Sequence, residues 1–304
     1  MIDINVNNET GRLNTVLIGI ADDFGGTPSI EECYDPKSIE HVLAGTFPLQ
    51  EEIILEMNNL VSIFNKYNID VLRPSNIKGV NQIFARDIAF VIDNKIVISN
   101  VIKNRAREIE AIRFMLDKIS AKDILKMPEE ARGEGGDVIL YEEFIFLGYS
   151  SEEDFNENLV ARTNYKALDF IAKNFPRKKV VGFELNKSDN NPKENALHLD
   201  CCFQPIGKNM AILYEGGFKN KKDVNFLYDL FGSQNIIKIS KEEMYNMNSN
   251  IFSLSENVII SEVGFNRLNT ELRRRGFTIE ETAFSEIAKM EGLFRCSTMP
   301  LNRQ

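Results

Sequence analysis

The sequence has few of the residues on which several large classes of protein depend. Its 304 residues include only four cysteines and no Cys-x-x-Cys pair, so no disulfide framework is indicated and a reducing compartment is the simpler interpretation. No apolar run approaches the roughly 20 residues that a membrane-spanning helix needs. The first residues are neither basic nor apolar, so we expect no secretory leader.

A surplus of positive charge is also missing. Lysine and arginine number 36 against 45 acidic residues, and the net charge of −9 argues against nucleic acid as a partner. The apolar share of 43% and the charged share of 27% are ordinary for a folded protein and exclude a disordered chain. We therefore expect a soluble cytoplasmic protein that binds a small molecule, with no membrane partner.

One structural pattern recurs five times along the chain. An apolar stretch is followed by an amphipathic helix, a second short strand and a polar segment. The apolar stretches are expected at 13–20, 90–99, 138–149, 204–214 and 251–263. The helices are expected at 49–65, 105–119, 160–175, 223–231 and 266–275, and the second strands at 71–72, 124–125, 179–185, 236–239 and 277–283. The alternative is an ordinary α/β sheet whose alternation only resembles a repeat.

Unusual polar residues fall at the same phase of these units. They lie in the segment that follows the second strand, and they are Asp87, Glu134, His198, Asp200 and Cys296. In α/β folds, ligands gather beyond one end of the strands, where loops from separate elements meet. We therefore expect these residues to converge on one site.

Cys296 is a candidate nucleophile. Gly292 before it and Pro300 after it indicate a constrained loop, although a lone cysteine is often only a small buried apolar residue. A nucleophilic thiol commonly needs an imidazole nearby, and one of the two histidines, His198, lies at the matching phase of another unit. The other, His41, adjoins a helix start and is expected to be structural or exposed.

Acidic residues surround this pair in the expected site. If Ala196–Asp200 is extended, His198 and Asp200 point to the same face. The glycine-rich segment Gly133–Asp137 lacks the spacing of a phosphate loop, and it could be a plain turn. Phe84–Asp87 could contribute only a structural ion pair between its arginine and its aspartate.

This composition favours a cationic substrate over a metal. One histidine and one plausible cysteine suit zinc poorly, so we predict no metal and no cofactor. Several carboxylates around a thiol should raise its pKa by repulsion. A guanidinium substrate would offset that repulsion, because its planar N–H donors match carboxylates bidentately.

Four motifs, in this order along nearly the whole chain, resemble those of the guanidino-group-modifying enzymes. That family includes arginine deiminase, dimethylarginine dimethylaminohydrolase and the arginine:glycine amidinotransferases. The motifs are Phe84–Asp87, Glu134–Asp137, His198–Asp200 and Arg295–Leu301. The resemblance implies an α/β fold of the pentein type, an α/β-propeller of five ββαβ-like modules with pseudo-fivefold symmetry. Residues 1–304 would then form a single catalytic domain.

The resemblance also implies roles for individual residues. Cys296 would be the nucleophile and His198 the general acid and base. Glu134, Asp87 and Asp200 would bind the guanidinium and orient the imidazole.

Three arginines are candidates for binding a substrate carboxylate. Arg162-Thr163-Asn164 resembles the Arg-Thr-Asn of the deiminases and dimethylaminohydrolases, in which the arginine meets the substrate's α-carboxylate. A surface arginine is the alternative for Arg162. Arg105 and Arg107 are weaker candidates, and solvated helix charges are the simpler interpretation of both.

The ending Arg295–Leu301 resembles that of arginine deiminase, although a chain of this length is nearer to the dimethylaminohydrolases and leaves little room for the deiminases' helical insertion. We therefore predict hydrolysis of arginine to citrulline and ammonia through a covalent thiouronium intermediate. The alternatives are an amidinotransferase, a dimethylarginine dimethylaminohydrolase and, from another class, a non-catalytic pentein that binds a ligand. Assembly as a homo-oligomer is left open.

Overall fold

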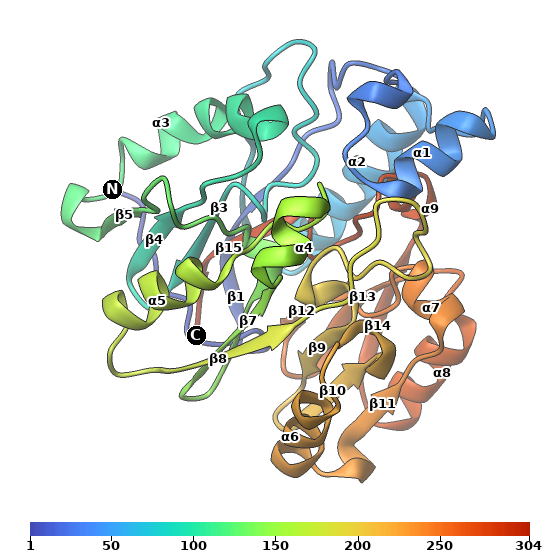
Figure 1. The fold of residues 1–304 in the computed structure, drawn as a ribbon. Coiled ribbons are helices and arrows are strands. Elements are labelled where there is room, and N and C mark those ends of the chain that lie inside the picture. Colours follow the sequence, from blue (N-terminus) through green and yellow to red (C-terminus); the bar gives the residue numbers. More distant parts are fainter.

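The structure, a computed structural model, describes residues 1–304 as five small sheets of three strands each. Figure 1 shows the sheets in the interior and the longer helices at the periphery. The sheets are β15 (Thr298–Arg303), β1 (Leu13–Ile18) and β2 (Asp70–Leu72); β3 (Ala89–Ile92), β4 (Lys95–Ile98) and β5 (Ile124–Lys126); β6 (Val138–Tyr141), β7 (Phe144–Tyr149) and β8 (Lys179–Glu184); β9 (Phe203–Ile206), β10 (Met210–Leu213) and β11 (Ile236–Lys238); and β12 (Phe252–Ser255), β13 (Val258–Glu262) and β14 (Thr278–Thr282).

The same connection is repeated in each sheet. Each sheet contains an antiparallel pair of strands, and the central strand of the sheet is parallel to the third. The pair comes first along the chain in four sheets, whereas in the sheet of β1 the antiparallel partner is the last strand, β15. Parallel strands need a crossover, which a helical segment supplies in every case. These segments are α2 (Gln50–Lys66), η2 (Lys103–Ile112) with α3 (Arg113–Leu116), α5 (Tyr165–Asn174), α6 (Lys221–Phe231) and α8 (Asn266–Arg274). The prediction of five ββαβ-like modules, and with it the pentein fold, is confirmed.

The remaining helices are short and lie in the connecting segments. They are η1 (Ile30–Glu32), α1 (Pro36–Leu43), η3 (Ala121–Asp123), η4 (Gly135–Asp137), α4 (Glu152–Glu157), η5 (Leu199–Cys201), η6 (Glu215–Gly217), η7 (Ser233–Asn235), α7 (Lys241–Tyr245) and α9 (Ser285–Ala288). No helix combines the length and apolar character that crossing a lipid bilayer would require.

The first sheet is closed by the two ends of the chain. β15 pairs antiparallel with β1, with Ile18 opposite Thr298 and Val16 opposite Pro300. We predicted no strand after residue 283, so β15 was missed. A pairing between residues about 280 positions apart leaves no local signal in the sequence. The strand also contains a proline, Pro300, which weakens the strand character of its own segment.

Three predicted segments differ from the structure. The helix expected over 105–119 is mostly a 3₁₀ helix, η2, and the helix expected from 160 begins at Tyr165. The extended conformation considered for Ala196–Asp200 does not extend to its end, because Leu199–Cys201 forms the 3₁₀ turn η5. In that turn the Leu199 N–H donates to Asp137 Oδ1 at 2.9 Å, so a buried carboxylate from another unit sets the backbone.

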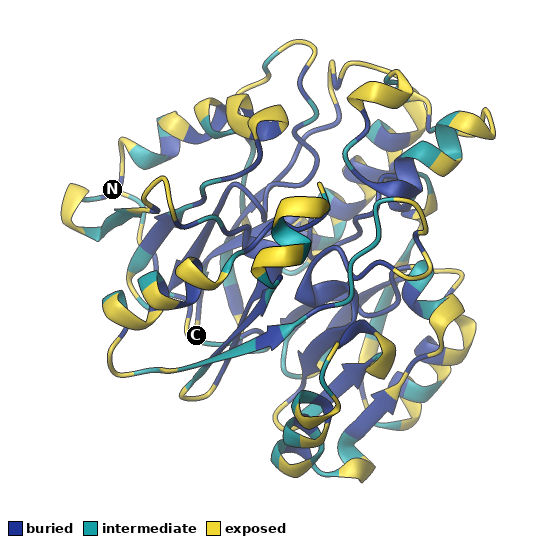
Figure 2. Ribbon diagram, in the orientation of Figure 1, coloured by how far each residue is buried: buried dark blue, intermediate teal, exposed yellow.

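The core lies between the sheets and the inner faces of the helices. Strands β3, β6 and β9 are buried along their whole length, and Figure 2 shows exposed residues mainly on the helices and loops. α6 buries Val224, Leu227 and Phe231, a spacing that keeps one helical face against the sheet. Polar segments after the parallel strands are thereby left to face one another.

Candidate active site

The segments that follow the parallel strands supply one set of buried polar side chains. All five units contribute, with Asp87 after β2, Glu134 after β5, His198 and Asp200 after β8, Asn250 after β11 and Cys296 after β14. The expected residues therefore converge. Asn250 was not among the predicted site residues, although its phase in the fourth unit matches the others and could have identified it.

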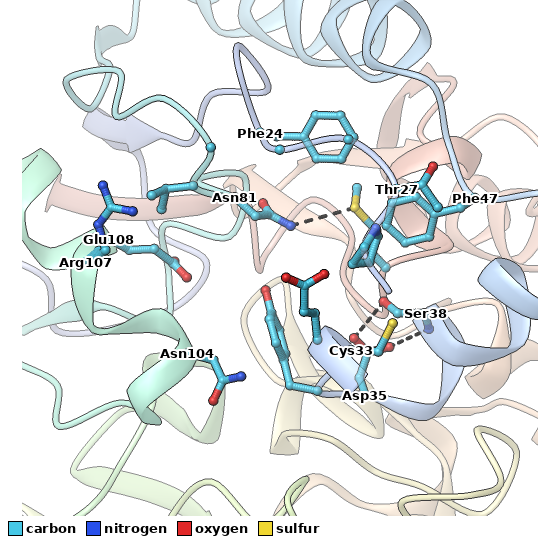
Figure 3. Close-up of a pocket in the computed structure, with 18 residues that line it drawn as sticks. Phe24, Thr27, Cys33, Asp35, Ser38, Phe47, Asn81, Asn104, Arg107 and Glu108 are labelled. Carbon is cyan, nitrogen blue, oxygen red and sulfur yellow. Dashed lines mark hydrogen bonds between the residues drawn. The ribbon is translucent and has the colours of Figure 1, made fainter. Parts of the chain in front are cut away.

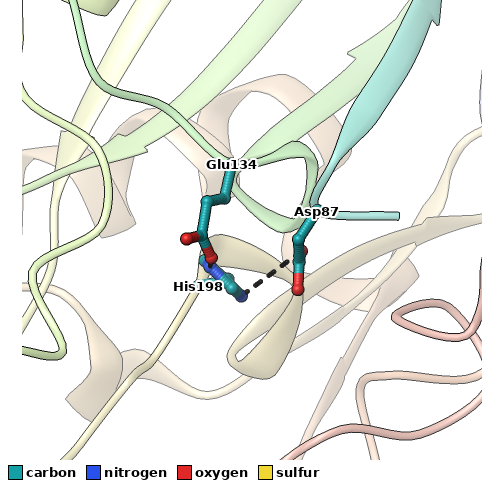
Figure 4. A group of neighbouring side chains, drawn as sticks. All are labelled: Asp87, Glu134 and His198. Atoms are coloured by element: carbon teal, nitrogen blue, oxygen red, sulfur yellow. Dashed lines mark hydrogen bonds and ion pairs between the residues drawn. The ribbon is translucent and has the colours of Figure 1, made fainter. Parts of the chain in front are cut away.

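The imidazole of His198 lies between two carboxylates, as Figure 4 shows. Its Nε2 is 3.0 Å from Glu134 Oε2 and its Nδ1 is 3.8 Å from Asp87 Oδ1. Burial by itself would lower the pKa of His198, but Asp87, Asp137 and Glu134 together raise it to about 9. The imidazole is therefore protonated at neutral pH and can donate a proton.

A close backbone approach makes room for this imidazole. The Gly136 N–H donates to Asp87 Oδ1 at 3.1 Å. A Cβ at Gly136 would lie 2.6 Å from His198 Nδ1 and 3.0 Å from that same carboxylate oxygen. Glycine is therefore required at this position for steric reasons.

The thiol of Cys296 is enclosed. Its residue is 2% exposed, and its Sγ is 3.7 Å from Asp200 Oδ2 and 3.2 Å from Asn250 Nδ2. Burial raises the pKa of Cys296 well above its usual range, and the charges of Asp200 and Asp87 raise it further. The acidic surroundings thus oppose ionisation of the thiol, as we expected from the sequence.

Asp200 is anchored by a buried arginine. Arg295 Nη1 donates to Asp200 Oδ2 at 2.8 Å, and Glu9 binds the same guanidinium at 3.0 Å and 3.2 Å. The sequence analysis missed Glu9 and assigned no role to Arg295. Arg295 directly precedes Cys296 in the sequence, and this position could have identified Arg295 as a site residue.

Arg105 anchors Asp87 in a similar way. Its Nη1 lies 2.7 Å from Asp87 Oδ2 and 3.4 Å from Glu134 Oε2, and it pairs with Glu108 at 2.8 Å. The interpretation of Arg105 as a solvated helix charge is wrong. A 3₁₀ helix places residues i and i+3 on one face, so Arg105 and Glu108 turn inward together while Arg107 stays exposed, as predicted.

Arg162 is buried and is not a surface arginine. Its Nη1 is 3.2 Å from Glu134 Oε2, its Nη2 donates to the Tyr34 carbonyl at 2.6 Å, and its guanidinium lies over the Tyr34 ring. Asn164 caps helix α5 through a bond from the Ala167 N–H. The Arg-Thr-Asn segment thus joins the Glu134 loop to the segment around Tyr34.

Asp87, Glu134 and His198 have ligand atoms within 4.8 Å of one another, which would suit a metal ion by distance alone. However, Arg105 and Arg162 already bind the carboxylate oxygens of this group. Two fixed cations would repel a third, so the donor set does not fit a metal. His41 lies outside the site, half-buried on α1 and bonded to Thr46.

A cavity of about 350 Å³ lies next to the site (Figure 3). Tyr34 and Glu108 line it, and these residues contact Arg162 and Arg105 on their other side. The exposed side chains of Arg107 and Asn104 line it as well. Arg105 and Arg162 therefore lie between the lining of the cavity and the carboxylates that face His198.

Known proteins are similar to this chain in sequence and in fold. The family described as N,N dimethylarginine dimethylhydrolase, eukaryotic, matches residues 46–303. The uncharacterized protein YkgA of Bacillus subtilis (strain 168) is 30% identical over 251 residues, which cover 81% of this chain and 79% of YkgA. The arginine deiminase of Bacillus cereus (strain B4264) is 28% identical over 210 residues, which cover 56% of this chain and only 47% of the deiminase.

Solved structures match nearly the whole fold. The N-terminal domain of ArgZ, an arginine dihydrolase of cyanobacteria, has a TM-score of 0.77 at 19% identity and covers 95% of this chain and 98% of that domain. SxtG, an amidinotransferase of Microseira wollei, has a TM-score of 0.76 at 18% identity, with 99% and 97% covered. DDAH from Pseudomonas aeruginosa has a TM-score of 0.72 at 16% identity, with 95% and 99% covered.

These structural likenesses show a shared fold, and the sequence match over residues 46–303 gives the family. The chain therefore belongs to the N,N dimethylarginine dimethylhydrolase family, within the pentein superfamily of guanidino-modifying enzymes.

Proposed function

We propose that this protein hydrolyses a guanidino substrate through a covalent bond to Cys296, and that arginine, converted to citrulline and ammonia, is the substrate. The observation that carries the proposal is the convergence of a buried thiol, a protonated imidazole and three carboxylates from separate units. The Arg86 N–H donates to the Cys296 carbonyl at 3.0 Å, which joins the Asp87 segment to the Cys296 segment. Asp87 in turn faces His198 at 3.8 Å.

Two carboxylate oxygens offer acceptor capacity for a guanidinium. Asp87 Oδ2 binds Arg105, whereas Asp87 Oδ1 accepts only one backbone N–H, from Gly136. Asp200 Oδ2 binds Arg295, whereas Asp200 Oδ1 has only sulfur neighbours, at 3.7 Å and 4.0 Å. A carboxylate oxygen can accept two hydrogen bonds, so these two Oδ1 atoms can bind a planar cation while the arginines hold the acids in place.

The bound cation then activates the thiol. A guanidinium beside Cys296 offsets the repulsion from the two aspartates and favours loss of the thiol proton to solvent. The thiolate forms an S–C bond to the guanidinium carbon, giving a tetrahedral adduct. His198 donates its proton to the departing nitrogen, the C–N bond breaks, and ammonia leaves a thiouronium cation on Cys296.

Hydrolysis completes the cycle. Neutral His198 takes a proton from water as the oxygen bonds to the thiouronium carbon. The second adduct collapses by breaking the C–S bond, releases citrulline and loses its remaining proton to the ammonia. Cys296 returns to its thiolate and His198 to its protonated form.

Arg162 is proposed to bind the substrate carboxylate, as the resemblance implies. In the unliganded structure its guanidinium is occupied by Glu134 and by the Tyr34 carbonyl. Substrate binding therefore requires the Tyr34 segment to move, and the adjoining cavity provides the approach. The domain proposed to carry out this reaction comprises residues 1–304, since both chain ends complete one sheet.

Dimethylarginine is the second candidate substrate, because the chain belongs to the N,N dimethylarginine dimethylhydrolase family. Both substrates would give citrulline, and they differ in whether ammonia or dimethylamine leaves. An amidinotransferase would release ornithine when an acceptor amine such as glycine is supplied.

The test is to incubate the protein with arginine, with dimethylarginine, and with arginine plus glycine, and to identify products by mass spectrometry. We expect citrulline and ammonia from arginine alone, and Cys296→Ser should lower turnover by at least about 10³-fold. Acid quenching of the wild-type reaction should trap a mass adduct on the peptide that contains Cys296. Turnover by Cys296→Ser near the wild-type rate would refute the covalent mechanism.

A further inference from the structure

Each of the five units contributes at least one residue to the site, and the proposed reaction gives no role to one of these residues. Four units supply the thiol, the imidazole and the carboxylates, and the fourth unit in chain order supplies Asn250. Its side chain is fully buried, and its carbonyl accepts the Arg295 N–H at 3.2 Å. The Asn250 segment is therefore fixed to the residue that precedes the nucleophile.

The side-chain amide of Asn250 makes two bonds to Cys296. Its Oδ1 accepts the backbone N–H of Cys296 at 3.1 Å, and its Nδ2 donates to the Cys296 Sγ at 3.2 Å. The backbone N–H can only donate, so the amide oxygen must face it. That requirement fixes the orientation of the amide and directs an N–H donor at the sulfur.

A backbone hydrogen bond at Leu293 also favours the charged form of this sulfur, whereas the other groups around it oppose its ionisation. Asp200 lies 3.7 Å away, the charge of Asp87 acts on it, and Cys201 is a second neutral thiol beside Asp200. Arg295 neutralises Asp200 and Glu9 but does not bond to the sulfur. Asn250 is thus the side chain whose donor stabilises negative charge on Sγ.

We propose that Asn250 is a catalytic residue, which stabilises the Cys296 thiolate through its Nδ2–H donor and holds the sulfur in position through its bond to the Cys296 backbone. The role rests on the proposed function, in which that thiolate attacks the substrate. A hydrogen bond to the charged form of a group favours that form. Without the donor, less thiolate would exist at neutral pH.

The rate of alkylation of Cys296 by iodoacetamide, followed as a function of pH by mass spectrometry of the Cys296 peptide, tests this role directly. Asn250→Asp keeps the acceptor for the Cys296 N–H and removes the donor to Sγ, and Asn250→Ala removes both. We expect alkylation at pH 7 to fall about tenfold or more in each, with the midpoint moved up by about one pH unit or more. Asn248→Ala is the matched control on the same loop and should keep the wild-type profile.

Wild-type pH profiles in both Asn250 variants would overturn the proposal. Alkylation needs no substrate, so the result stands even if arginine is not turned over, and failure of the proposed function is seen separately in the product assay. If the variants do not fold, the test uses the ¹⁵N-labelled wild-type protein, in which the side-chain amide resonance of Asn250 is followed as a function of pH. It should titrate with the midpoint of Cys296 alkylation, and a resonance that does not respond to that titration would contradict the role.

Discussion

Among single residues, Asp87, Glu134 and Asp200 are each paired with at least one buried arginine. Arg105 holds Asp87, Arg162 holds Glu134, and Arg295 holds Asp200. A buried charge is tolerated only when it is paired and hydrogen-bonded, so these arginines allow three acids to lie beside one thiol. The guanidinium fork matters here, because lysine offers a point charge without the bidentate geometry.

Loss of one of these cations should be costly. Arg105→Met leaves Asp87 and Glu108 buried without their partner, and we expect the free energy of unfolding to fall by about 3–5 kcal/mol. Arg107→Met, in the same helix but exposed, should change it by less than about 0.5 kcal/mol. Urea denaturation measures both, and equal effects of the two substitutions would contradict the pairing.

The charge on His198 predicts a pH dependence of stability. Its pKa in the folded protein is about 9, above its ordinary value of 6.5, because Asp87, Asp137 and Glu134 outweigh the effect of burial. A raised pKa means that the folded state binds the proton more tightly, so the stabilisation is complete below about pH 6.5 and is lost as pH rises through about 9.

The comparison that isolates this effect is wild type against His198→Gln. Urea midpoints measured between pH 6 and pH 9.5 should fall more steeply for the wild type, and the gap between the two proteins should narrow as pH rises. A constant gap over that range would mean that His198 carries no extra proton in the folded state.

At the scale of elements, short 3₁₀ turns position the site residues more than the regular helices do. The turn η4 brings the Gly136 N–H to Asp87, and η5 follows directly after His198. Such turns form where side chains from other units bond to the backbone, as Asp137 does at Leu199. The site therefore depends on contacts between units as well as on each unit's own fold.

Gly136→Ala tests this close approach. The added methyl group would lie 2.6 Å from His198 Nδ1, so the imidazole must shift, and we expect turnover to fall about 10²-fold. Gly133→Ala is the control in the same segment, because its methyl group would meet the flexible end of Met127 at 3.1 Å and the Ala167 Cβ at 3.3 Å, and neither belongs to the site. Kinetic assays should give a much lower turnover for Gly136→Ala than for Gly133→Ala. Equal turnover of the two variants would argue against the steric role of Gly136.

In the molecule as a whole, the last strand of the chain completes the first sheet. β15 pairs with β1, and Cys296 lies two residues before β15 begins. The strand that completes the first sheet therefore also holds the nucleophile in place. The core consists of three apolar clusters, each with residues from more than one unit. Separation of neighbouring units would therefore expose apolar surface.

Removal of residues 298–304 should abolish cooperative folding, because β1 then loses its antiparallel partner and Met299 and Leu301 leave the core. Removal of Gln304 alone deletes one backbone hydrogen bond and should leave the transition nearly unchanged. Thermal unfolding followed by circular dichroism measures both. A cooperative transition in the longer deletion would show that the fold does not need β15.

The five-unit alternation, the position of the polar segments within each unit and most of the residues that converge there could be predicted from the sequence. These features depend on periodicity and on neighbours within each unit, which are local properties of a chain. Asp87, Glu134, His198, Asp200 and Cys296 could be selected because their shared phase predicts a shared edge.

Only the tertiary structure decided which side chains bind one another at that edge. The pairing of β15 with β1, the burial of Arg105 and Arg162, and the contact of Asn250 with Cys296 all join distant segments. Such contacts depend on the final packing of the units and leave no periodic trace in the sequence. A charged residue that looks solvated along its own helix is buried when another unit supplies its partner.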